Sequence, residues 1–146
     1  MQFLSTEILQ KLGESLLKLI QLKHLRLDLG YAKTVNNKGV EALANAIQKL
    51  SGLSVLDLDF SGNKDIDDVE KVAETLRCLP SLYSVQLRCI GCPCLKQNQR
   101  SLCSLFDALG DMKNIKEVLL SIPYNKINEQ EVNDLKQKKI LTISWF

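Results

Sequence analysis

A frame of four apolar residues, L-x-x-L-x-L-x-L, recurs along the chain and constrains its fold more than any other feature. Its copies begin at Leu22, Leu53, Leu82 and Ile115, which are 31, 29 and 33 residues apart. Alternation of apolar and polar residues at period two is typical of a strand with one buried face. The frame predicts strands near 22–29, 53–60, 82–89 and 115–122, with a fifth near 140–146.

A second apolar frame precedes each predicted strand, at helical spacing. Apolar residues stand 13, 10, 6 and 3 positions before the first residue of all four strand frames; in the second unit they are Val40, Leu43, Ile47 and Leu50. Steps of 3, 4 and 3 place these side chains on one stripe of a helix. Residues suited to cap the helix starts come just before the stripes: Ser5 or Thr6, Asn36 or Asn37, Asp67 or Asp68, and Gln99 or Ser101.

One helix and one strand cannot bury two apolar faces alone, but stacked copies can, with parallel strands in one sheet and helices covering one side of it. The segment VNNKGVEALANAIQKLSGLSVLDLDF resembles the ribonuclease-inhibitor-like class of leucine-rich repeats, and the likeness extends over nearly the whole chain. The resemblance implies an α/β horseshoe, a short leucine-rich-repeat solenoid. We expect about five helix–strand units in a single domain, 1–146, with the parallel sheet on the concave face.

Composition excludes several classes of function. The 146 residues carry 19 basic and 17 acidic side chains, a net charge of +2, so no strong overall field favours nucleic acid or membrane. No apolar run is long enough to span a bilayer, and residues 1–20 do not read as a secretory signal. We expect an intracellular, cytoplasmic protein with reduced cysteines. A local basic patch leaves RNA binding as a weaker alternative, through Lys11, Lys18, Lys23 and Arg26 or the KQKK segment.

The stretch DLDFSGNKDIDD, 57–68, resembles a calcium-binding EF-hand loop. Oxygen-bearing side chains occupy loop positions 1, 3, 5, 7, 9 and 12, and glycine occupies position 6. However, the strand frame directs Leu56 and Leu58 to the core, so Asp57 and Asp59 point together to the opposite face. We therefore predict a strand, a turn and a helix start, and keep a calcium site as an alternative.

Three cysteines, Cys89, Cys92 and Cys94, form a C-x-x-C-x-C cluster that could contribute zinc ligands. Cys89 replaces the apolar residue at the end of the strand frame, which predicts that it faces the core instead. A metal-responsive regulator, using calcium or zinc, is therefore the alternative function. The favoured interpretation requires no cofactor and no metal.

No catalytic pattern is evident, because the chain has one histidine, no glycine-rich phosphate loop and no nucleophile motif. We expect a non-enzymatic protein–protein interaction module that serves as a structural or accessory subunit of a larger assembly. The predicted partner contacts on the sheet face are His24, Arg26, Asp28, Asp57, Asp59, Gln86, Arg88, Glu117 and Leu119. Trp145 and Phe146 on the last strand form a second predicted contact, with a partner or with another copy of the chain.

Overall fold

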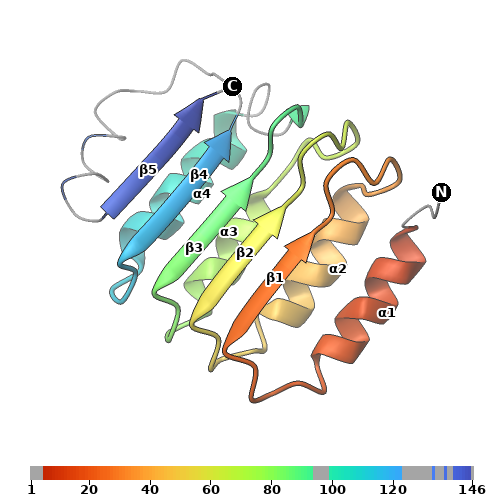
Figure 1. Cartoon of the computed structure of the whole chain (residues 1–146), viewed down its shortest axis with the longest axis horizontal. Coiled ribbons are helices and arrows are strands. Elements are labelled where there is room, and N and C mark those ends of the chain that lie inside the picture. The colour runs from red at the N-terminus through yellow and green to blue at the C-terminus, as the bar shows by residue number, and fades with distance from the viewer. Residues whose placement is uncertain (1–4, 94–98, 123–132, 134–136, 138–139, 146) are drawn as a thin grey trace.

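The computed structural model describes residues 5–93, 99–122, 133, 137 and 140–145. Helices and strands alternate through the first four units (Figure 1). The helices are α1 (Thr6–Leu16), α2 (Asn37–Ile47), α3 (Glu70–Arg77) and α4 (Gln99–Asp111). The strands are β1 (His24–Asp28), β2 (Val55–Asp59), β3 (Ser84–Arg88), β4 (Glu117–Ile122) and β5 (Ile140–Trp145).

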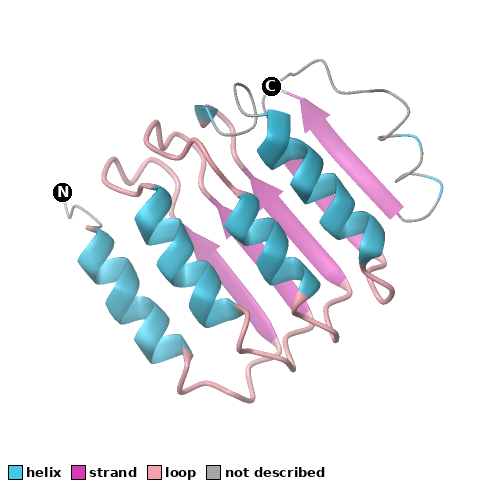
Figure 2. Cartoon of the chain, turned by 180° about the vertical axis from the view of Figure 1, so that it is seen from behind, coloured by secondary structure: helices cyan, strands magenta, loops and turns pink. Residues whose placement is uncertain are grey.

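The five strands form one parallel sheet in the order β1-β2-β3-β4-β5, so chain neighbours are also sheet neighbours. The four helices lie on one side of this sheet, as Figures 1 and 2 show from its two sides. The architecture is α/β, and the helices leave the other face of the sheet uncovered. We call this uncovered surface the open face.

The strand register follows the apolar frame. Residues at equal frame positions lie side by side in neighbouring strands. One such set, in strand order, is Leu25, Leu56, Val85 and Val118. All four are buried. Each observed strand falls inside its predicted range, and the parallel pairing predicted from the repeat is confirmed.

The helical stripes supply the other half of the core. In α2 the predicted stripe residues Val40, Leu43 and Ile47 are at most 2% exposed, as is Leu50 just after the helix. The first unit departs from this pattern, because Leu19 is 49% exposed and Leu12 only partly buried. In Figure 2, α1 lies beside α2 at one end of the helical layer, and none of the other described helices lies on its outer flank, which accounts for the weaker burial of this unit.

Helices α1 and α2 start with capping residues that the sequence suggests. Ser5 accepts a hydrogen bond from the Ile8 N–H, and Asn36 Oδ1 accepts one from the Gly39 N–H at 3.1 Å. At α3 the arrangement differs, because Asp68 accepts from the Glu70 N–H at 2.7 Å while Ser101 donates to the same Asp68 carboxylate at 2.9 Å. The start of α3 is thus fixed by a residue of α4.

Among the residues that the structure describes, no helix combines the length and the apolar character needed to cross a membrane.

Candidate functional site

The open face carries three rows of side chains, each row running across the strands. The register confirms the predicted alignment of Asp28, Asp59 and Arg88 in one row. It also confirms that Arg26, Asp57 and Gln86 share the next row, where Leu119 follows. His24, Val55, Ser84 and Glu117 form the third row. Neighbouring members of a row lie about 4.8 Å apart along the sheet, within reach of long side chains.

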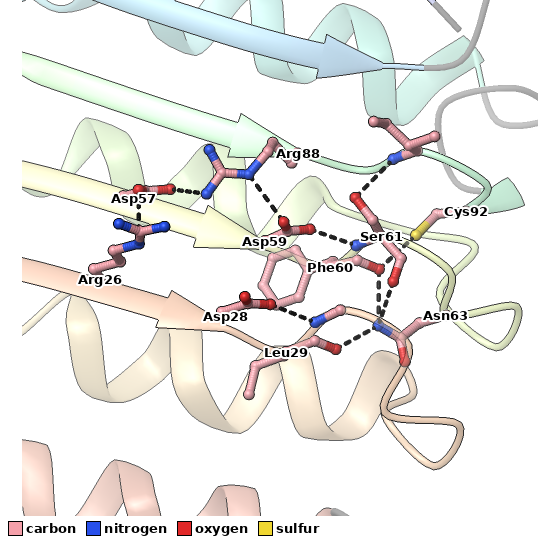
Figure 3. Close-up of polar contacts among 12 residues, drawn as sticks. Arg26, Asp28, Leu29, Asp57, Asp59, Phe60, Ser61, Asn63, Arg88 and Cys92 are labelled. Atoms are coloured by element: carbon pink, nitrogen blue, oxygen red, sulfur yellow. Dashed lines mark hydrogen bonds and ion pairs between the residues drawn. The ribbon is translucent and has the colours of Figure 1, made fainter.

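Four charged residues of the open face form a network over β1, β2 and β3 (Figure 3). Arg88 spans two aspartates, with its Nη2 at 2.9 Å from Asp57 Oδ1 and its Nε at 2.9 Å from Asp59 Oδ2. Arg26 Nε lies 3.4 Å from the second oxygen of Asp57. We call Arg26, Asp57, Asp59 and Arg88 the charge network. It uses two cations and two anions, so its net charge is zero.

The charge network is partly shielded from solvent. The side chains of Asp57 and Asp59 are 14% and 17% exposed, and that of Arg88 is 19% exposed. Desolvation on its own would raise the pKa of Asp59, but hydrogen bonds from Ser61 and Arg88, together with the Arg88 charge, lower that pKa below its usual value. Both aspartates are among the predicted partner contacts, and both carboxylates also form ion pairs with arginines of the same chain.

The exposed part of the open face lies around this network. His24, Arg26, Asp28 and Glu117 are exposed, and the Arg26 side chain retains 73% of its accessible surface. Gln86 and Leu119 are half-buried between them. The Ser84 hydroxyl lies 3.2 Å from Glu117 Oε2, which links β3 to β4. The surface is therefore mixed in charge, with its neutralised centre on β2 and β3.

The structure resolves the 57–68 stretch into three elements rather than one ion-binding loop. Asp57 and Asp59 belong to β2, Ser61 and Asn63 are buried in the turn that follows, and Asp68 accepts a hydrogen bond from the Glu70 N–H at the start of α3. These oxygens serve hydrogen bonds and ion pairs of different elements. Within the described parts of the chain, no group of three or more His, Cys, Asp or Glu side chains is arranged to hold a metal ion.

The described cysteines of the C-x-x-C-x-C cluster also occupy separate structural positions. Cys89 is fully buried, as its place in the strand frame predicts. Cys92 is 1% exposed, and its Sγ lies 2.9 Å from the Phe60 carbonyl oxygen, to which the thiol donates. Cys94 lies outside the described residues. The two described members of the cluster are thus core and turn residues.

One polar arrangement escaped sequence-based reasoning. The Asn63 side chain donates from Nδ2 to the carbonyl oxygens of Leu29 and Phe60, both at 2.8 Å (Figure 3). Cys92 makes the equivalent contact one unit later, to Phe60. Asn63 and Cys92 each stand ten residues after the first residue of their strand frames, Leu53 and Leu82. That shared offset was the available signal, and it marks residues that join adjacent turns.

The C-terminal strand supplies the remaining predicted contacts. Trp145 pairs with Ile122 in the register of β4 and β5. Phe146 lies outside the described residues. A contact role for this edge therefore stays a prediction.

Comparisons with known proteins identify a solved structure of similar fold but no protein family to which the chain belongs. No protein-family model matches the chain, and no curated protein matches it. A solved structure titled "Leiomodin-1 Actin-Binding Site 2 (ABS2)" is similar, with a TM-score of 0.62 at 10% sequence identity, covering 94% of this chain and 77% of that chain. At this identity the likeness concerns the fold alone.

Proposed function

We propose that this chain is a non-enzymatic protein-binding module of the leucine-rich-repeat type, which contacts a protein partner through the open face of its sheet. Its place would be that of a structural or accessory subunit in a larger assembly. The observation that carries the proposal is the open face itself: the helices cover only the opposite side, and His24, Arg26, Asp28 and Glu117 stand exposed on it.

The repeat class is supported by the regularity of the units. Frame residues of β1 to β4 stand side by side in the sheet, and each helix packs against the next one in the chain. Solenoids built this way commonly use an extended, uncovered strand surface for binding. The solved structure of similar fold is titled as an actin-binding site, which supports a protein as the class of partner.

The charge network suits a recognition surface because it fixes the side chains at its centre before a partner arrives. Arg88 is held by two carboxylates at 2.9 Å, so little conformational entropy remains for it to lose on binding. Arg26 is held at only one point and is mostly exposed. We infer that Arg26, Asp28 and Glu117 make the direct contacts while Arg88, Asp57 and Asp59 orient the surface.

Affinity purification of the tagged 146-residue chain, with identification of the copurifying proteins, tests the proposal. Actin is included as a named candidate by cosedimentation with filaments. The matched variant reverses three exposed charges on the open face: Arg26→Glu, Asp28→Lys and Glu117→Lys. We expect the partner to be lost from this variant, because reversed charges at a contact surface repel the groups that they formerly attracted.

A control variant reverses three charges on the exposed surface of α1 and the turn after it: Glu14→Lys, Lys18→Glu and Lys23→Glu, all at exposed positions. This variant should retain the partner. Circular dichroism confirms that both variants are folded. Retention of the partner by the open-face variant, or its loss from the α1 variant alone, contradicts the proposed surface.

A further inference from the structure

A second candidate binding site lies at the edge of the sheet where the first three strands end. The turns after β1, β2 and β3 enclose a hollow of about 710 Å³, within the size range of ligand pockets. Its lining comprises Tyr31, Lys33, Gly62, Lys64, Asp65, Ile90 and Gly91. We call it the turn pocket. It is separate from the open face, whose described residues belong to the strands.

Part of the described lining of the turn pocket is apolar. Tyr31, Gly62 and Gly91 occupy equal places in three successive turns, and all three have positive φ values of 56°, 75° and 76°. A Cβ atom added at Gly62 would lie 2.3 Å from Tyr31 Cδ1, so the tyrosine ring rests directly against the glycine backbone. Tyr31 is nevertheless 72% exposed. The ring, the two glycines and Ile90 form a shelf on which another apolar group could lie.

The charges of the turn pocket favour an anionic ligand. Lys33 and Lys64 stand against Asp65, which leaves one excess positive charge. Among the ion pairs within 4.0 Å that the described residues form, none includes either lysine. Both side chains are exposed. No described carboxylate therefore pairs with either ammonium group, and both groups are accessible to the carboxylate of a ligand.

From this combination we propose that the turn pocket binds an acidic peptide segment of a partner protein. An aromatic side chain of the peptide lies on the shelf formed by Tyr31, Gly62 and Gly91, and a neighbouring carboxylate contacts Lys33 and Lys64. Aromatic groups stack on exposed tyrosine rings, and exposed lysines attract carboxylates. A peptide fits better than nucleic acid, because the described residues of the lining include two lysines and no arginine, fewer cations than a groove for a phosphate backbone uses.

The experiment starts from an unbiased probe. A phage-displayed library of random twelve-residue peptides is selected on the immobilised 146-residue chain, and the enriched peptides are synthesised with a fluorescent label. We expect the enriched sequences to combine Asp or Glu with Phe, Tyr or Trp. Tyr31→Ala, and separately the double variant Lys33→Glu with Lys64→Glu, should each weaken binding by about tenfold, which corresponds to the loss of one aromatic contact or two exposed charge contacts.

The control variant, Lys49→Glu with Lys113→Glu, makes the same change of charge at exposed positions that do not line the turn pocket. It should leave the dissociation constant within about twofold, since distant exposed charges are largely screened in physiological salt. Amide shifts of Gly62 and Gly91 in NMR titrations place the peptide directly. The proposal is overturned if the library enriches no sequence, if enriched peptides lack acidic residues, if they bind the pocket variants unchanged, or if an oligouridylate RNA displaces them from the pocket.

This test is independent of the proposed function. The open-face variant with Arg26, Asp28 and Glu117 reversed keeps all residues of the turn pocket, so it should bind the selected peptides normally. Loss of peptide binding in that variant would place the peptide on the open face and overturn the assignment to the pocket.

Discussion

The side-chain amide of Asn63, in the turn after β2, is a buried polar group that joins two units. It is 1% exposed, and its Nδ2 joins the carbonyl oxygens of Leu29 and Phe60. Each carbonyl belongs to the end of a different strand, where the sheet ladder no longer supplies a donor. A single side chain thus donates to backbone groups of two successive units, and the Phe60 carbonyl oxygen also accepts from the Cys92 thiol.

Replacing Asn63 by alanine should lower the free energy of unfolding by about 1–3 kcal/mol, because the Leu29 carbonyl oxygen loses its side-chain donor and the Phe60 carbonyl oxygen loses one of its donors. Urea denaturation followed by circular dichroism measures the change. Asn45→Ala is the matched control, since Asn45 is exposed on α2 and should change stability by less than about 0.5 kcal/mol. Equal effects of the two substitutions would show that the Asn63 bonds contribute nothing specific.

The lowered pKa of the Asp59 carboxyl predicts how the free energy of unfolding depends on pH. Its folded pKa lies below the ordinary value of 3.8, since the hydrogen bonds and charge of Ser61 and Arg88 outweigh desolvation. A group with a lowered folded pKa stabilises the protein above its unfolded pKa, and this contribution is lost as the pH falls through the folded pKa. Unfolding free energy should therefore decrease as the pH drops below about 4.

Asp59→Asn should flatten this acid limb, because asparagine does not titrate. Urea midpoints recorded from neutral to strongly acidic pH give the slope. The control is Asp107→Asn, at an exposed position of α4, which should leave the slope as in the parent chain. An unchanged slope in Asp59→Asn would mean that other carboxyls cause the acid sensitivity.

At the scale of helices and strands, equal frame positions do not have equal energetic roles. Leu50 and Leu19 each stand three residues before their strand frames, yet Leu50 is 1% exposed and Leu19 49%. Leu50→Ala should cost about 2–5 kcal/mol, as core truncations do, while Leu19→Ala should cost less than about 1 kcal/mol. Thermal or urea unfolding compares the two. Similar losses would indicate that Leu19 is buried in solution.

The elements that sequence predicts well are those set by spacing. The period-two frame predicted the strands and their register, because a shift of one residue would turn Leu56 and Leu58 out of the core. For the open face, this register also predicted that Asp28, Asp59 and Arg88 would align. The same frame separated Asp57 and Asp59 from a calcium loop, because strand residues two apart point the same way.

The features that the sequence did not predict depend on how side chains of different repeat units contact one another. A linear pattern places Arg88 beside Asp59, but only the folded chain shows that its guanidinium spans Asp57 as well. The burial of Asn63 could not be inferred from its turn composition, since asparagine is common in exposed turns. The exposure of Leu19 follows from the position of α1 at the end of the helical layer, which a repeating frame does not encode.

For the molecule as a whole, the main property is that each unit packs on its chain neighbours. The substantial contacts between described elements join α1 to α2, α2 to α3 and α3 to α4, and each strand to the next. In such a linear array, stability is approximately a sum of unit and interface contributions. Units flanked on both sides should therefore open less often than the first one.

Amide hydrogen exchange should reveal this gradient. We expect amides of β2 and β3 to exchange at least about tenfold more slowly than those of β1, because opening the first unit breaks one interface while opening a central unit breaks two. Mass spectrometry of peptides that cover 24–28, 55–59 and 84–88 measures the three rates under native conditions. A single common rate for these strands would show that the array opens only as one cooperative unit.

Leu9→Ala sharpens this prediction, because Leu9 is fully buried where α1 meets α2, with its Cδ1 so close to Gly39 that an added Cβ would lie 2.5 Å away. Truncating it weakens the first interface and leaves the later ones intact. Exchange in β1 should accelerate while exchange in β3 stays within about twofold of the parent chain, as a nearest-neighbour array requires. Equal acceleration in both strands would contradict the nearest-neighbour array. It would mean that the interface between α1 and α2 stabilises every strand of the sheet, so a substitution in one unit would also affect the open face of the other units.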